Sequence, residues 1–471
     1  MGALSLEAPA SRTAEARENV ELADAGSAHE PGHATASRIW LRPSIAVGGW
    51  FALVLATNVW GQVLLGQGRH LFLGTPPLYG WLRSVQPGRI ALPLLGAIAV
   101  AACAARWGVA LSARLGWRAL LCWTAVAAAV WAVALALVDP LGPAALVRPL
   151  RLPTESYQLP LPPSVLDFLR HYVARLPRYP VQLRGHPPGM VLVLWALRWL
   201  GLGGARWAAG LMIGAWAAAV PAALAAYAAL GGKAAARRAA PFLVVGPAAI
   251  WVATSADALF AAVATAAIAL FVAALHVGAR RGARHAYIHA LGSGLLFGCA
   301  LFLTYGVAPL ALVFVVVAAA RHRWRELAAA ALGAGAVAVA FGAAGFWWFE
   351  GLLATRVEVH RDVAHSRPYS YFVVANLAAL AIALGPAVVA GLTGMARSLP
   401  WLLTAAAVAA LAATDASGLV RGEVERIWLP FVPWLLIATG GLRGGERSAR
   451  RWLLGQGALA IGLQTGFHFP W

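Results

Sequence analysis

The chain has 471 residues, of which 61% are hydrophobic and only 12% are charged. Soluble domains carry about 25% charged residues, so this composition excludes an ordinary soluble protein. The formal charge of +19 does not indicate nucleic-acid binding, because the basic residues form no single stripe or tail. They flank the ends of apolar segments, as in the cytoplasmic connections of membrane proteins. We therefore expect a protein embedded in a lipid bilayer, with no nucleic-acid partner.

The N-terminal segment differs from the rest of the chain. Residues 1–40 are polar, rich in Ala, Glu and Ser, and show no periodic apolar pattern, which is typical of a disordered tail. They lack the apolar core of a signal peptide. We expect this tail to be cytoplasmic and residues 41–471 to form a transmembrane domain.

Apolar runs recur from Ile45 onward, and a helix that crosses a bilayer needs roughly 20 such residues. They do not alternate between polar and apolar residues, as the strands of a β-barrel would. The sequence therefore predicts an all-α polytopic bundle of about 13 spans, within a range of roughly 11 to 14. The expected spans are 45–66, 90–105, 119–138, 205–228, 241–255, 258–277, 290–303, 305–320, 327–349, 370–390, 400–413, 427–440 and 453–467.

The apolar segment 189–200 is too short to cross and contains Arg198, so we expect a re-entrant or interfacial piece on the outer face. This assignment places the N-terminus in the cytoplasm and the C-terminus outside a cell (plasma) membrane. It also leaves only Glu326 and Glu446 of the acidic residues beyond the tail on the inner side. The polar chemistry is then expected on the outer face.

A long external loop, residues 139–204, interrupts the apolar spans. It contains PSVLDFLRHYVARL, whose apolar residues share one helical face. Such amphipathic helices rest on membrane surfaces, and a structural lid is the simplest interpretation of this one. Those apolar residues are Val165, Leu166, Leu169, Tyr172, Val173 and Leu176.

The same loop carries two carboxylates and a histidine motif. Asp139 follows the third expected span, and Glu155 lies in TESYQL; either carboxylate alone is compatible with simple solvation. RGHPPGMVLVLWAL, from Arg184, places His186 and two prolines before an apolar segment. Proline is common in the first turn of a helix, so a helix start is the alternative interpretation.

Two later motifs also contain ionisable residues beside spans. SADALF places Asp257 between two spans, where burial in the membrane would be costly. The segment RGEVERIWLPFVPW begins at Arg421. It places Arg421, Glu423, Glu425 and Arg426 directly before the start of an expected span. An interfacial salt-bridge anchor is an equally good interpretation of the second motif.

Together these motifs resemble the GT-C glycosyltransferases, which use lipid-linked sugars at the outer face of a membrane. Glu155 with Tyr157 resembles the acidic motif of that class, and His186 with the following prolines resembles its H/K-P-P motif. Asp257 resembles the later aspartate, and Glu425 with Arg426 resembles the late E-x-R-Y-x-x-P segment. The arrangement looks most like uncharacterised actinobacterial integral membrane proteins near this class.

The resemblance implies transfer of a hexose or pentose, such as mannose, from polyprenyl phosphate to a glycan, lipid or protein acceptor, with inversion. It implies Glu155 as the catalytic base, with Asp139 as the alternative because no second acid follows Glu155. A divalent cation is used by some members, and nothing in the sequence requires one. The donor and phosphate contacts would be His186, Arg361, Arg367, Tyr369, Arg421 and Arg426, with Tyr157, Asp257, Glu358, His360 and Glu425 as further site residues.

Two other functions stay open. A transporter or flippase for a lipid-linked glycan would need charges near the midplane and inverted repeats of broken helices, and a non-catalytic envelope scaffold would need no external acid. The absence of D-x-D and of a phosphate-binding Gly-rich loop favours a lipid-linked donor over a nucleotide sugar. Because the loop from Gln67 to Arg89 contains no acid, we interpret the first two spans as an addition to the class pattern or a variation of it.

Overall fold

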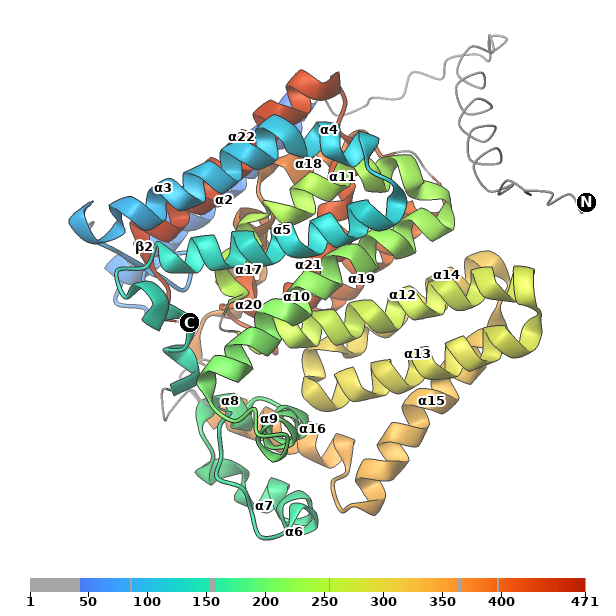
Figure 1. The fold of residues 1–471 in the computed structure, drawn as a ribbon. Coiled ribbons are helices and arrows are strands. Elements are labelled where there is room, and N and C mark those ends of the chain that lie inside the picture. The colour runs from blue at the N-terminus through green and yellow to red at the C-terminus, as the bar shows by residue number, and fades with distance from the viewer. Residues whose placement is uncertain are drawn as a thin grey trace, which may run out of the picture. The chain divides into compact units, whose positions relative to one another are not determined.

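The structure is a computed structural model that describes residues 43–84, 87–151, 157–253, 255–361, 366–395 and 398–470. This part of the chain is almost entirely helical (Figure 1), apart from one two-residue strand pair. The prediction of an all-α protein is confirmed at this level. The expected tail, residues 1–40, lies outside the described residues.

Among the described residues, seven helical segments are long and apolar enough to cross a membrane. Five of them are single helices: α2 (Pro43–Gly66), α5 (Trp117–Leu137), α12 (Asp257–Arg281), α13 (Ala283–Leu303) and α15 (Trp324–Ala343). The segment Ile90–Arg114 is formed by α3 (Pro87–Cys103), η1 (Ala104–Gly108) and α4 (Val109–Arg114). The segment Ala205–Val244 is formed by α10 (Ala205–Tyr227), η5 (Ala228–Gly232) and α11 (Lys233–Val244). These helices indicate a membrane protein, whereas the expected count of about 13 spans is not confirmed.

The remaining apolar runs form shorter or bent helices. α17 (Tyr369–Leu384) and α18 (Pro386–Leu392) meet at an angle of 97° and would make an eighth span if they cross together. The other elements between η5 and the C-terminal strand are η6 (Pro247–Trp251), η7 (Tyr305–Leu310), α14 (Ala311–Arg321), α16 (Trp348–Arg361), α19 (Trp401–Ala416), α20 (Val424–Ile427), η9 (Leu429–Phe431), α21 (Val432–Leu436), η10 (Ile437–Gly441) and α22 (Gly445–Gly466).

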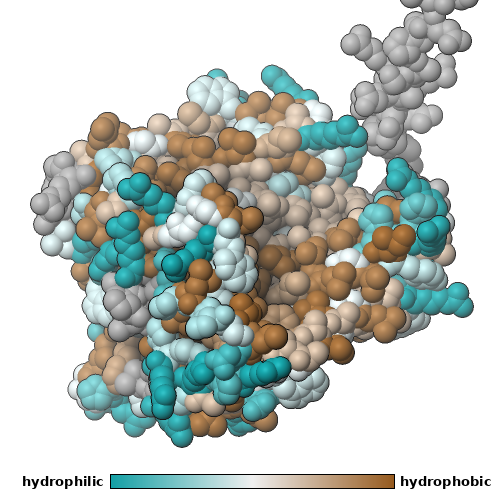
Figure 2. Space-filling view, turned by 60° about the horizontal axis from the view of Figure 1, so that its bottom comes forward, coloured by the Kyte–Doolittle hydropathy of each residue, from teal (hydrophilic) through white to brown (hydrophobic). Residues whose placement is uncertain are grey.

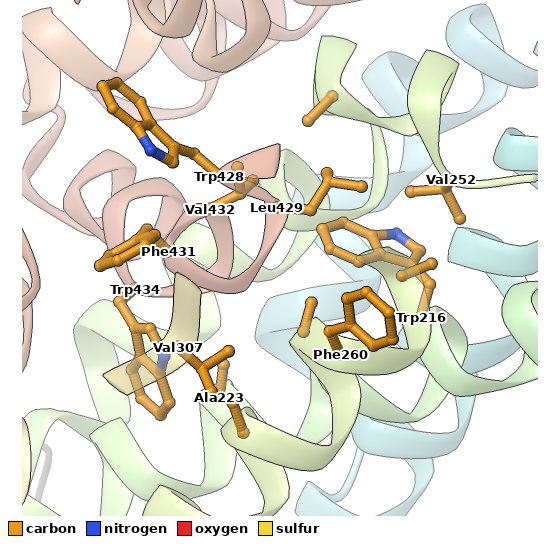
Figure 3. Packing of buried hydrophobic residues seen from close by; sticks show 14 of the residues in the cluster. Trp216, Ala223, Val252, Phe260, Val307, Trp428, Leu429, Phe431, Val432 and Trp434 are labelled. Carbon is orange, nitrogen blue, oxygen red and sulfur yellow. The ribbon is translucent and has the colours of Figure 1, made fainter. Parts of the chain in front are cut away.

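The core surrounds α12, most of which is buried between α10, α13 and the short helix η9. Figure 3 shows Leu429 of η9 directed toward Trp216 of α10 and Phe260 of α12. The expected span 427–440 is thus a chain of short buried helices inside the protein. Hydropathy alone does not separate such a segment from one that faces lipid.

Glycines bring α13 and α15 into close contact. A Cβ on Gly294 would collide with the backbone of Ala330, and one on Gly333 would collide with the backbone of Leu291. Small residues allow this backbone approach between membrane helices, where dispersion contacts replace the hydrophobic effect. The outer face of α15 is largely exposed and apolar, as Figure 2 shows for the surface near α12 to α15, and this is consistent with lipid contact.

Side-chain contacts show which connections share one end of the bundle. Arg83, before α3, pairs with Asp139 after α5, and Arg426 of α20 pairs with Asp257 at the start of α12. At the opposite end, Arg237 donates to carbonyls at the end of α4. The predicted external segments therefore lie together at one end.

The predicted amphipathic helix of the external loop is broken into α6 (Val165–Arg170), α7 (Tyr172–Arg175) and η4 (Leu176–Arg178). Phe168 and Tyr172 are buried, with ring contacts to Trp195 of α9 (Gly189–Trp199) and to Phe346. The apolar face therefore covers protein, and this corrects the expectation that it rests on the membrane. The loop also contains η2 (Gly142–Leu146), η3 (Pro149–Arg151) and α8 (Val181–Arg184).

The predicted interfacial piece is α9, which has 11 residues and is therefore too short to cross. Its first residue is Gly189. A glycine is needed at this position because a Cβ would collide with the backbone of Phe302 at the end of α13. Nearby, β1 (Trp81–Leu82) pairs antiparallel with β2 (Phe467–His468). The C-terminal strand thus lies at the same end as the external loop.

Candidate functional site

Two of the predicted motifs meet in a buried ion pair. Arg426 Nη1 donates to Asp257 Oδ2 at 2.8 Å, and both residues are almost fully buried. Ser255 Oγ also donates to Asp257 Oδ2 at 2.7 Å and accepts a hydrogen bond from the Asp257 N–H. Asp257 opens α12, where the helix dipole also favours a negative charge. The carboxylate is therefore compensated on several sides.

Glu423 extends this ion pair into a network. Its Oε2 accepts from Arg426 Nη2 at 3.2 Å, and its Oε1 lies 3.6 Å from Arg367 Nη1. Glu423 has a left-handed backbone conformation with φ of 62°, directly before α20. We name Asp257, Glu423, Arg426 and Arg367 the charged cluster; its two carboxylates and two guanidinium groups balance.

Arg367 and Arg421 are held by backbone carbonyls. Arg367 donates from Nε to Leu71 and from Nη2 to Phe72, while Arg421 donates from Nη1 to the Arg367 carbonyl at 2.8 Å. Arg421 also lies over the ring of Tyr369. These contacts give both arginines a structural role, and their predicted contact with a donor phosphate stays a prediction.

Glu425 is buried beside the charged cluster. Its Oε1 accepts from the backbone N–H of Tyr79 at 2.8 Å, whereas its Oε2 is buried without a hydrogen-bond partner among the described residues. Burial raises the pKa of Glu425 to about 7. This carboxyl group therefore gains and loses a proton near neutral pH, unlike an ordinary glutamate.

His186 and Tyr157 approach the cluster from the external loop. The ring centroids of His186 and Tyr157 lie 5.5 Å apart, and both rings contact Phe260, one turn beyond Asp257 on α12. Burial lowers the pKa of His186; the Asp257 carboxylate opposes this effect and Arg426 adds to it. His186 Nδ1 lies 2.7 Å from the Gln182 carbonyl, which only accepts hydrogen bonds. The neutral ring therefore carries its proton on Nδ1, and Nε2 is an acceptor.

Asp139 lies in a different place. Its Oδ2 accepts from Arg83 Nη2 at 2.6 Å, and its Oδ1 accepts from the Leu141 N–H. It lines an open cleft of about 810 Å³ with Arg83 and His468. Residues 79–83 connect the two places, because Tyr79 contacts Glu425 and Arg83 contacts Asp139.

Glu358 joins helices α8 and α16. Glu358 is buried on α16, 3.6 Å from Arg184 of α8 and 2.8 Å from Arg361 of its own helix. Arg361 is largely exposed, and His360 Nδ1 lies 2.6 Å from the carbonyl of Arg356. These residues form a second group, and no described contact links them to the charged cluster.

Glu155, the predicted base, lies outside the described residues, and Tyr157 is the nearest predicted site residue that the structure describes. Of the other predicted residues, those that come together are Tyr157, His186, Asp257, Arg367, Glu425 and Arg426. Asp139 occupies the neighbouring cleft. In the part of the chain that the structure describes, no group of three or more His, Cys, Asp or Glu side chains could hold a metal ion.

Several contributing residues were not predicted as site residues. The loop before α3 has no acid, yet it supplies Arg83, the N–H of Tyr79 and the carbonyls of Leu71 and Phe72. The interpretation of the first two spans as an addition or a variation did not anticipate these contacts of the loop. Arg83 was the only available signal in the sequence, because backbone groups are the same in every residue. No protein-family model, curated protein or solved structure matches this chain.

Proposed function

We propose that the protein is a GT-C-like membrane glycosyltransferase, which moves a sugar from a polyprenyl-phosphate donor to an acceptor at the external face of the membrane. The observation that supports this proposal is the meeting of four distant motifs around Phe260 and the charged cluster. Tyr157, His186, Asp257 and Arg426 come from separate segments, and each matches one motif of the class.

The chemistry assigns different tasks to these groups. Transfer to a hydroxyl needs a base that accepts its proton, and Glu155 takes that role, with Asp139 as the alternative. Neutral His186 offers Nε2 as an acceptor for a sugar hydroxyl. Arg426, held by Asp257 and Glu423, supplies a fixed positive charge that stabilises negative charge on the leaving phosphate.

The ion pair of Asp139 bears on the choice of base. Arg83 and the Leu141 N–H hold the Asp139 carboxylate in one orientation. Both oxygens of Asp139 are thus already engaged as hydrogen-bond acceptors within the protein. We therefore keep Glu155 as the first choice.

The decisive experiment is sugar transfer by purified full-length protein in lipid vesicles. Labelled polyprenyl-phosphate mannose, arabinose and glucose are offered with an acceptor extract, and release of polyprenyl phosphate is measured. We expect release by the wild type and its loss in Glu155→Gln. Release that persists in that variant and disappears in Asp139→Asn moves the base to Asp139. No release from any donor by folded protein contradicts the transferase.

A transporter or flippase for a lipid-linked glycan is the second candidate, and the bent pair α17–α18 favours it. The bend is built around Gly385, whose φ is 76° and whose Cα approaches Gln456 closely. Broken helices are common in transporters. Movement of a fluorescent lipid-linked sugar between leaflets, without sugar release, would support this candidate over the transferase.

A further inference from the structure

The cleft beside Asp139 is basic. Three arginines and one aspartate lie among the described residues that line it, which leaves two positive charges in excess. Burial lowers the pKa of His468, with the charges of Arg148 and Arg83 adding to this effect, so this histidine is neutral at pH 7. The arginines are Arg83, Arg148 and Arg151.

These arginines have N–H groups that donate to no other described residue. Arg83 uses Nη2 for Asp139, and its buried Nη1 has no hydrogen-bond partner among the described residues. Arg148 and Arg151 are exposed, and within the described ranges neither side chain forms an ion pair or hydrogen bond. A guanidinium group binds phosphate through two parallel hydrogen bonds and stays charged at any physiological pH. The cleft therefore offers phosphate oxygens several free donors.

The rim of the cleft is apolar. Trp81, Leu82 and Leu141 line it and expose 43%, 72% and 46% of their surface. The cleft follows the end of the membrane-length helix α5 and includes β1 and His468 of β2. Exposed tryptophan at the end of a membrane helix is typical of the interface between lipid tails and headgroups.

We propose that this cleft binds the phosphate group of a membrane lipid, with Arg148 and Arg151 on its oxygens and Trp81 and Leu82 against the start of its tail. Arg83 is a positioning and binding residue here: Asp139 fixes its guanidinium group while Nη1 stays available. A free phosphate ion would use the arginines but gain nothing from the exposed apolar rim. The rim therefore favours a lipid as the source of the phosphate.

The proposal goes beyond the proposed sugar transfer and does not depend on it. The cleft is separate from the charged cluster, and the segment 79–83 contacts both. At about 3.3 Å per residue, this segment spans roughly 13 Å. A protein that moved or held a lipid-linked glycan without chemistry would use the same contact.

The test is lipid binding to the full-length protein without any sugar. Delipidated protein in detergent is titrated with dioleoyl phosphatidic acid or dioleoyl phosphatidylcholine, and bound lipid is counted by native mass spectrometry. We expect preferential binding of phosphatidic acid. The variant Arg148→Ala with Arg151→Ala should weaken that binding at least roughly tenfold, because charge-assisted hydrogen bonds are lost.

Matched variants separate this site from general charge attraction. Arg178→Ala removes an exposed arginine of the same external loop that does not line the cleft, and it should leave affinity unchanged. Arg148→Lys with Arg151→Lys keeps the charge but loses the fork geometry, and should bind with intermediate affinity. Equal loss in the Arg178 variant overturns the assignment to the cleft.

Two further results overturn the proposal. One is unchanged phosphatidic acid binding by the double alanine variant, shown to be folded by its unfolding temperature. The other is full competition by millimolar inorganic phosphate, which would identify a free-phosphate site. Trp81→Ala tests the rim directly: it should weaken phosphatidic acid binding and leave inorganic phosphate binding unchanged.

Discussion

Arg426 and Asp257 are 169 positions apart in the sequence, yet their side chains meet at 2.8 Å in the interior of the protein. Arg426 also contacts Glu423, so its removal leaves Asp257 without its cation and Glu423 with Arg367 alone. Removing one partner of a buried ion pair costs about 3–5 kcal/mol, because the remaining charge stays buried. The pair therefore couples the start of α12 to α20.

We expect Arg426→Gln to lower the free energy of unfolding by at least about 3 kcal/mol. Asp257→Asn should cost less, because Arg426 then keeps Glu423. Unfolding in mixed micelles measures both. Arg450→Gln is the control, since it breaks an exposed pair with Glu446, worth at most about 1 kcal/mol. Equal losses in Arg426→Gln and the control would contradict a buried network.

Glu425 predicts a pH-dependent stability. Burial raises the pKa of Glu425 from 4.5 to about 7, so the folded state prefers the protonated form. The stabilisation of the folded state by protonated Glu425 is fully present below about pH 4.5 and is lost as the pH rises through about 7. Above that pH, ionisation costs the folded state about 3 kcal/mol.

Glu425→Gln should therefore raise the unfolding temperature at pH 8 and change it little at pH 5. Glutamine keeps an acceptor for the Tyr79 N–H, so this hydrogen bond is preserved. The difference between variant and wild type across pH 5–8.5 removes the contributions of His186 and His468. A difference that does not change with pH would show that Glu425 does not titrate in this range.

The contact between α13 and α15 predicts opposite effects for two glycines on one helix. Gly333→Ala pushes a methyl group into the backbone of α13, which is unable to move aside locally. Overpacking of this kind costs about 1–3 kcal/mol. Gly335→Ala meets nothing within 4 Å and should stabilise the helix by roughly 0.5–1 kcal/mol. Unfolding temperatures of the two variants, measured in the same micelles, should therefore lie on opposite sides of the wild type.

The Arg184–Glu358 contact predicts a local effect. Glu358→Gln removes the charge that attracts Arg184 of α8 to α16. We expect faster amide hydrogen exchange in residues 181–190 and 348–361, with little change in α12. Glu350→Gln, on the exposed side of the same helix, is the control. If exchange rises equally in both variants, the ion pair does not hold α8 in place.

The sequence could predict the membrane helices because a span of α5 or α12 carries its own signal in a continuous apolar run. The predicted count of about 13 spans is not confirmed, and one apolar run shows a physical reason. Residues 427–440 are as apolar as a span, but they are buried within the protein, chiefly against α11, α12 and α18. An apolar run records only that water is excluded, and the protein interior excludes water as well as the bilayer does.

The candidate site was predictable in part. His186, Asp257 and Arg426 are polar residues beside apolar runs, so each was visible as a local exception. Their partners were not visible, because the pairing of Arg426 with Asp257 depends on tertiary packing. The role of residues 71–83 was hidden for another reason: most of their contribution comes from backbone groups.

The strand pair has a consequence for the order of assembly. β1 lies before α3, while its partner β2 follows α22, after all the other helices. During synthesis Trp81 and Leu82 therefore stay without their strand partner until α22 has been made and inserted. His468, a lining residue of the basic cleft, arrives with that same strand. If translation stopped within α22, the released chain would contain the preceding membrane helices. It would lack β2 and therefore His468, one of the residues that line the basic cleft.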